Sequence, residues 1–195
     1  MPRVSFGADL AFERNSSALV GVSRDGDKYR VIVLKEIIPR DGAPLKPKFV
    51  IDTFAGIILG HHAASMVSDA HYRASAKEHL EPHGIRFIDA PTGREGVNAV
   101  YLLLKKLVTE KRLILPNHRR LLAQVKGLVA KPQPGGSFKI GSPQPTSALD
   151  RSHGDIASAL VLALWRAERT QEGGGGGVVG PSPSFDARPI GDFPC

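Results

Sequence analysis

The spacing of apolar residues changes from a strand period to a helix period early in this chain, and that change restricts the fold. Three short apolar or alternating segments come first, at Val4 to Ala8, Ala18 to Ser23 and Tyr29 to Ile38. Asp25-Gly26-Asp27 is a hairpin turn signal, so these segments predict an antiparallel meander. After a loop at residues 39–47, helical and strand patterns alternate, which predicts a mixed sheet with added parallel strands.

The later segments give the rest of the predicted domain. Helices are expected near residues 50–60, 70–83, 95–111, 117–126 and 153–169, with short strands at 63–68, 85–89 and 113–115. Residues 128–141 are expected to form a β-hairpin, with a Pro- and Gly-rich turn at 132–136. The sequence therefore predicts one α/β domain over residues 1–170. Its mixed sheet has antiparallel first three strands and later parallel strands, and is flanked by helices.

Residues 171–195 differ in composition from the rest of the chain. They include five consecutive glycines and few apolar residues, which cannot bury enough surface to offset chain entropy, so a disordered tail is expected. Cys195 is the single cysteine and cannot form an intramolecular disulfide. No apolar run approaches the roughly 18 residues of a membrane span. The N-terminus leads directly into a strand, so no signal peptide is expected.

Three aspartates stand where a metal-dependent nuclease needs carboxylates. Asp9 closes the first apolar segment, Asp69 closes the fourth, and Asp155 opens the last helix. Functional residues of α/β sheets gather at the carboxyl ends of strands, so Asp9 and Asp69 are adjacent if the first and fourth strands are neighbours. Carboxylates are ligands that Mg²⁺ and Mn²⁺ prefer, and two such ions can assist phosphodiester hydrolysis.

Each aspartate also has a structural alternative. Asp9 could be a turn residue at a strand end, and Asp69 could be the N-cap of the following helix. Ser152 and Asp155 together resemble a capping box. The helix after Asp155 is apolar on nearly every side, so it is expected to be buried and to hold Asp155 at the edge of the core.

Positive charge is concentrated in the second half of the domain. The chain has a net charge of +7, and between Leu103 and Ile140 nine Lys or Arg residues stand against one acid. This excess favours an anionic partner, although solvated helix faces can have the same composition. The residues expected to contact DNA phosphates are Arg119, Arg120, Lys126, Lys131 and Lys139. His71 and His153 flank the aspartates and are accessory candidates; simple local hydrogen bonding is the alternative for both.

The residues around the three aspartates resemble the nuclease domain of phage large terminase subunits, a branch of the RNase H-like superfamily. The resemblance is carried by FGADLAFERNSSALVGVS, VSDAHYRASAKEHL and HGDIASALVLALW, with a basic hairpin before the last helix. It covers about residues 1–170. The chain departs from the family at Gly154 and Ser158, where the family often has acids, and at Asn15, where some relatives carry an aspartate.

The resemblance implies a metal-dependent endonuclease that cleaves double-stranded DNA during viral genome packaging in the host cytoplasm. It implies two Mg²⁺ or Mn²⁺ ions, with Asp9 bridging both and with Asp69 and Asp155 each holding one. The implied partners are an ATPase domain, the portal and the small terminase subunit. The chain has no G-x-x-x-x-G-K-[ST] motif, so it is expected to be the nuclease part without the motor.

Three other functions remain as alternatives. A Holliday-junction resolvase shares the fold and the late acid on a helix. A non-catalytic DNA-binding or assembly module on the same fold is favoured by the missing acids at Gly154 and Ser158. An actin-like or sugar-kinase ATPase also begins with an acid after the first strand, but the short chain without Gly-rich phosphate loops argues against it.

Overall fold

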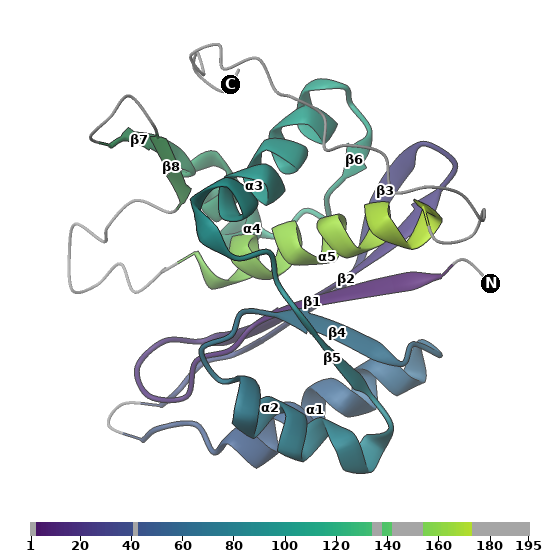
Figure 1. The fold of residues 1–195 in the computed structure, drawn as a ribbon, viewed down its shortest axis with the longest axis vertical. Coiled ribbons are helices and arrows are strands. Elements are labelled where there is room, and N and C mark those ends of the chain that lie inside the picture. Colours follow the sequence, from purple (N-terminus) through teal and green to yellow (C-terminus); the bar gives the residue numbers. More distant parts are fainter. Residues whose placement is uncertain (1–2, 41–42, 134–137, 142–153, 173–195) are drawn as a thin grey trace.

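A six-stranded mixed sheet runs through the centre of the protein (Figure 1). The computed structural model describes residues 3–40, 43–133, 138–141 and 154–172. The strands are β1 (Val4–Asp9), β2 (Ser17–Asp25), β3 (Lys28–Ile37), β4 (Ser65–Ser68), β5 (Arg86–Asp89) and β6 (Leu113–Ile114). Their order is β5-β4-β1-β2-β3-β6. β1, β2 and β3 pair antiparallel, whereas β4, β5 and β6 join in parallel, so the predicted mixed sheet is confirmed.

Helices cover both faces of this sheet (Figure 1). The helices are α1 (Pro47–Gly60), α2 (Arg73–Leu80), the 3-10 turn η1 (Glu81–His83), α3 (Gly93–Thr109), α4 (Arg119–Lys126) and α5 (Asp155–Glu172). α1 and α2 pack on one face, around buried residues such as Phe6 and Leu19. α3, α4 and α5 pack on the other, around Val20 and Leu160. Because side chains of a strand alternate between faces, β1 and β2 contribute to both cores.

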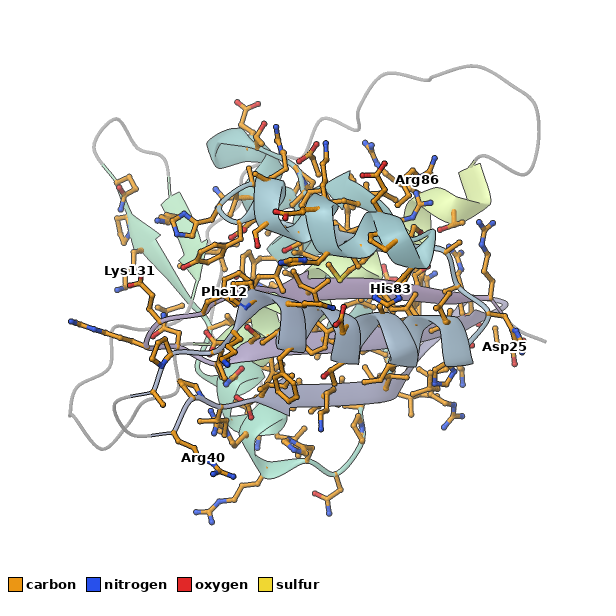
Figure 2. The ribbon with its side chains drawn as sticks, turned by 90° about the horizontal axis from the view of Figure 1, so that it is seen from below. Phe12, Asp25, Arg40, His83, Arg86 and Lys131 are labelled. Atoms are coloured by element: carbon orange, nitrogen blue, oxygen red, sulfur yellow. The ribbon has the colours of Figure 1, made fainter. Side chains whose placement is uncertain are left out.

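A separate hairpin stands beside the helical layer, as predicted. Its strands are β7 (Val129–Pro132) and β8 (Phe138–Gly141), paired antiparallel. The Ile140 N–H donates to Asn98 Oδ1 on α3 at 3.1 Å, which attaches the hairpin to that helix. Figure 2 shows Lys131 of this hairpin at the same end of the sheet as Phe12, and Asp25 at the opposite end. Part of the predicted turn, residues 134–137, lies outside the described residues.

Several element boundaries differ from the sequence prediction. α2 begins at Arg73, three residues later than expected, and its N-cap is Tyr72. The interpretation of Asp69 as an N-cap is therefore wrong. Asp69 Oδ1 instead accepts a hydrogen bond from the His71 N–H at 3.1 Å, which closes a turn ahead of the helix. α1 begins earlier than expected, at Pro47, because proline is compatible with the first turn of a helix.

Two sequence predictions concern residues outside the described part of the chain. Ser152 and His153 fall in the segment 142–153, so the capping box is untested. Most of the predicted tail falls in residues 173–195. None of the helices in the described ranges has the length and apolar character needed to cross a bilayer.

β1 and α5 pack backbone against backbone at Gly7. A Cβ atom at this position would lie 2.3 Å from the Ala163 nitrogen and 2.4 Å from the Ala159 oxygen. Both alanines are fully buried. Glycine on the strand and alanine on the helix therefore permit an approach that larger side chains would block, and this places α5 directly over β1.

Replacing Gly7 by alanine should destabilise the protein strongly. The added Cβ meets backbone atoms of α5, which cannot move aside as a side-chain tip can, so we expect a loss of about 3 kcal/mol or more. Gly56→Ala is the matched control, because Gly56 lies in the exposed part of α1 with open space around its Cβ position. That substitution should stabilise by about 0.5–1 kcal/mol. Urea unfolding of both variants measures the difference, and equal effects would contradict the packing argument.

Candidate active site

Two of the three aspartates lie at neighbouring strand ends. β1 and β4 pair in parallel, with Phe6 opposite Met66 and Gly7 opposite Val67. Asp9 is the last residue of β1 and Asp69 directly follows β4. The condition that the first and fourth strands are neighbours is therefore met, and both acids stand at the same edge of the sheet. Asp9 is partly buried, whereas Asp69 is exposed.

The third aspartate reaches this edge from the helical layer. Asp155 is the first residue of α5, and only 4% of it is exposed. Its Oδ2 accepts a hydrogen bond from the Ser16 hydroxyl, which comes from the loop between β1 and β2. Because α5 crosses directly over β1 at Gly7, its first turn stands above the strand end that carries Asp9.

The charges of the three carboxylates act on one another. Burial, and then the negative charges of Asp155 and Asp69, raises the pKa of Asp9 to about 7, while a hydrogen bond from Ser158 opposes the rise. Grouped carboxylates that repel one another are a donor set that suits a divalent cation, because the cation relieves the repulsion.

The three carboxylates do not form a complete metal site in this structure. Among the described residues, no three His, Cys, Asp or Glu side chains are grouped so that they could hold a metal ion as they stand. The carboxylate of Asp69 is exposed, and its Oδ1 accepts a hydrogen bond from the His71 N–H. The donors fit a divalent ion in their chemistry, and their side chains would have to converge further to bind one.

Two positions that depart from the family pattern have structural explanations. Gly154 has φ +81°, in the left-handed region that glycine adopts without strain. Ser158 is one helical turn after Asp155; its hydroxyl bonds Asp9 and lies 3.3 Å from the Tyr101 hydroxyl. Burial raises the pKa of Tyr101, and the nearby charge of Asp9 adds to the rise. Hydroxyl groups therefore border Asp9 on the side of α3 and α5.

Other residues near the site were not found by sequence reasoning. Ser16 bonds Asp155 and Tyr101 lies against Ser158, but nothing in local spacing distinguishes them from ordinary turn and helix residues. Asp89 ends β5 beside Ser68, so a fourth acid stands at this edge of the sheet. Its carboxylate is paired with Arg73 at 2.7 Å.

Of the two histidine candidates, the structure describes only His71. His71 is exposed, its ring lies edge-on to Tyr72 at 4.4 Å, and its backbone N–H bonds Asp69. His153 lies outside the described residues.

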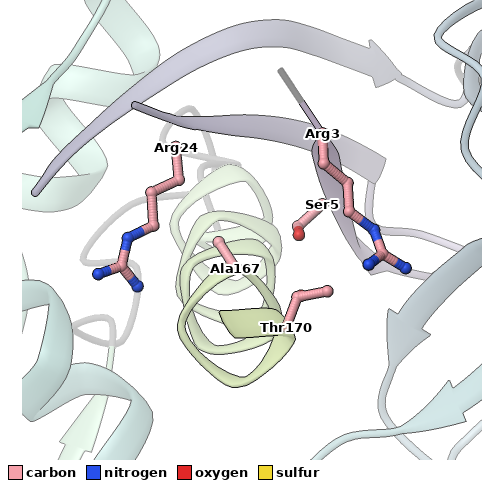
Figure 3. Close-up of a pocket in the computed structure, with 5 residues that line it drawn as sticks. All are labelled: Arg3, Ser5, Arg24, Ala167 and Thr170. Atoms are coloured by element: carbon pink, nitrogen blue, oxygen red, sulfur yellow. The ribbon is translucent and has the colours of Figure 1, made fainter. Parts of the chain in front are cut away.

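Four of the five basic candidates have exposed side chains. These are Arg119, Lys126, Lys131 and Lys139. Arg120 differs, because its Nη2 lies 2.9 Å from Glu36 Oε1 in an ion pair. A further basic feature lies elsewhere, in a pocket lined by Arg3, Ser5, Arg24, Ala167 and Thr170 (Figure 3). Arg3 precedes the first residue of β1 and Asp9 is its last, so this pocket is at the opposite end of the strand.

Solved structures that share this fold include large terminases and their nuclease domains. The nuclease of the large terminase from thermophilic phage G20c has a TM-score of 0.70 at 16% identity, over 85% of this chain and 82% of that one. The large terminase of bacteriophage HK97 gives 0.69 at 16%, over 84% of this chain and 39% of that one. The g2p nuclease domain of bacteriophage SPP1, with bound Mn, gives 0.56 at 15%, over 84% and 86%.

At these identities the likeness establishes the fold. It confirms the predicted RNase H-like architecture of large terminase nuclease domains. No family model matches the chain. No curated protein matches it either.

The raised pKa of Asp9 predicts a pH-dependent stability in the absence of metal. An acid with a raised pKa holds its proton in the folded state at pH values where the unfolded chain has already lost it, so stability falls as pH rises from about 3.8 and the loss is complete above about 7. Asp9→Asn removes the titration. Its melting temperature should already exceed that of the wild type at pH 5, and the excess should grow by roughly 4–8 °C, or about 2 kcal/mol, between pH 5 and pH 8. Scanning calorimetry in EDTA tests this, and a constant difference across pH would contradict it.

Proposed function

We propose that this chain is a metal-dependent endonuclease that cleaves double-stranded DNA during viral genome packaging, as the nuclease part of a large terminase. The observation that carries the proposal is that Asp9 and Asp69 lie at neighbouring strand ends and that the charges of Asp155 and Asp69 both act on Asp9, in a sheet with the terminase nuclease fold. Solved neighbours with bound magnesium, cobalt and manganese support the use of a divalent ion.

The three aspartates would hold two ions, Mg²⁺ or Mn²⁺, with Asp9 shared between them. The chemistry that such ions supply is activation of water and stabilisation of the leaving 3′ oxygen. The chain's own residues set up the donors: Asp9 is held by Ser158, and Asp155 by Ser16. Asp9 ends a strand and Asp155 begins a helix, so these two carboxylates are held on regular elements. Asp69 lies in the turn that follows β4.

The basic side chains would position the duplex by its phosphates. Lys131 of β7 and Lys139 of β8 are directly opposite each other in the paired strands of the hairpin. Both are exposed, and Figure 2 shows Lys131 at the end of the sheet where β1 finishes. Phosphate contacts of this kind supply affinity without reading sequence. The ATPase domain, portal and small terminase subunit are proposed as partners, in the host cytoplasm.

Cleavage of supercoiled plasmid with Mn²⁺, Mg²⁺ or EDTA tests the proposal. Asp9→Asn and Asp155→Asn should each lower the rate by at least about 100-fold, because the remaining carboxylates hold the ions poorly. Asp89→Asn is the matched control, since Asp89 ends the neighbouring strand but is paired with Arg73, and it should retain activity. Metal-dependent cutting that survives both substitutions would overturn the assignment. DNA binding without cutting in any metal would favour a non-catalytic module, and preference for branched DNA a resolvase.

Salt dependence tests the phosphate contacts separately from cleavage. The variant Lys131→Ala/Lys139→Ala should bind duplex DNA more weakly, and the slope of log K against log salt should fall by about 0.9 for each lost contact. Lys28→Ala is the control, because Lys28 is exposed but begins β3 at the other end of the sheet. Fluorescence anisotropy in EDTA at several salt concentrations gives the slopes. Equal slopes for the hairpin variant and the wild type would exclude these lysines from the DNA path.

A further inference from the structure

A single hydroxyl group lies between two carboxylates beside the aspartate cluster. Ser16 Oγ bonds Asp155 Oδ2, and it also lies 2.8 Å from Glu36 Oε1. All three groups are withdrawn from water: Ser16 is 5% exposed, Asp155 is 4% exposed and the Glu36 side chain is 10% exposed. A serine hydroxyl has one hydrogen, so it can donate fully to only one of the two carboxylates at a time.

The sheet places Glu36 on the same face as Asp9. Asp9 of β1 is paired with Ala18 of β2, and Ala18 is paired with Glu36 of β3. Residues directly opposite each other in antiparallel strands point to the same face. Asp9, Ala18 and Glu36 therefore form one row across the sheet, under the first turn of α5.

Arg120 supplies a second donor to the carboxylate of Glu36. Its Nη2 is 2.9 Å from Glu36 Oε1, the same oxygen that Ser16 approaches. A charged donor satisfies this oxygen better than a neutral hydroxyl does. With Glu36 satisfied by Arg120, the Ser16 hydrogen is available to Asp155.

A further contact joins α4, the helix that carries Arg120, to α5. Gln124, one turn after Arg120 on α4, accepts a hydrogen bond from the Ala157 N–H at 3.0 Å, in the first turn of α5. α4 is thus connected to the start of α5 directly through Gln124 and indirectly through Arg120, Glu36 and Ser16. The start of α5 is the element that carries Asp155.

We propose that Glu36 and Arg120 are positioning residues that orient Asp155 for metal binding through the Ser16 hydroxyl. This rests on the proposed function, because it takes Asp155 to be a metal ligand. It also changes the role expected of Arg120. Its first task is to hold Glu36, whereas the adjacent Arg119, which is exposed, remains a candidate for contact with DNA.

Binding of Mn²⁺ without DNA, measured by electron paramagnetic resonance, tests the proposal without relying on cleavage. Glu36→Gln and Arg120→Gln should each weaken Mn²⁺ binding by about 10-fold or more, as loss of a partner behind a metal ligand commonly does. The double variant should be no weaker than the worse single variant, because both act through one hydrogen-bonded chain. Arg120→Lys keeps the charge and should recover most of the binding.

Arg119→Gln is the matched control, since it removes the same charge one residue away on the same helix. It should leave Mn²⁺ binding unchanged. If Arg120 were only a DNA contact, Arg119→Gln and Arg120→Gln would both weaken DNA binding and neither would alter Mn²⁺ binding, which would overturn the inference. Thermal unfolding of each variant identifies any loss caused by misfolding, and the Arg120 pair of variants still decides the question if Glu36→Gln does not fold.

The outcomes separate the two proposals. No Mn²⁺ binding by the wild type, or binding unaffected by Asp155→Asn, would refute the aspartate site itself. Binding that requires Asp155 but is unchanged by Glu36→Gln and Arg120→Gln would refute only the positioning role. In the cleavage assay, a positioning defect should lower kcat at fixed Mn²⁺ and be partly recovered by more Mn²⁺, with KM for DNA unchanged.

Discussion

The backbone contact between β1 and α5 is the interaction on which the rest of the site depends. Gly7 has no side chain, and Ala159 and Ala163 carry only methyl groups, so strand and helix approach more closely than larger residues allow. This approach holds the first turn of α5 above the end of β1. Asp155 and Ser158 can therefore act on Asp9 although they are distant from it in sequence.

Grouping carboxylates at this edge costs stability, and the surrounding contacts offset part of that cost. Burial makes ionisation of Asp9 unfavourable, and the charges of Asp155 and Asp69 add to this. Hydroxyl donors compensate: Ser158 bonds Asp9, and Ser16 bonds Asp155. Such local conflict with stability is typical of functional sites, where a ligand supplies the missing compensation. A divalent cation is a ligand of the required charge.

Sequence reasoning succeeded where the signal was local and strong. The alternation in residues 29–38 predicted β3, because burial of one face of a strand leaves a period of two in the sequence, and the continuous apolar run after Asp155 predicted that α5 is buried. It was wrong about the start of α2, because the chain forms a turn closed by a bond from the His71 N–H to Asp69 before the helix begins at Arg73. Charge along the sequence could not show that Arg120 is paired with Glu36.

The sequence by itself determined the strand and helix segments, the three aspartates at their ends and the concentration of positive charge in residues 103–140. Hydrophobic period and composition are local properties, so they can be read from the sequence without knowing which residues are neighbours in space. The tertiary structure decided the strand order, the burial of Asp155 and the link from Arg120 through Glu36 to Ser16. Ser16 and Asp155 are 139 residues apart. Contacts at such separations depend on how helices pack on the sheet, and no residue pattern along the chain records that packing.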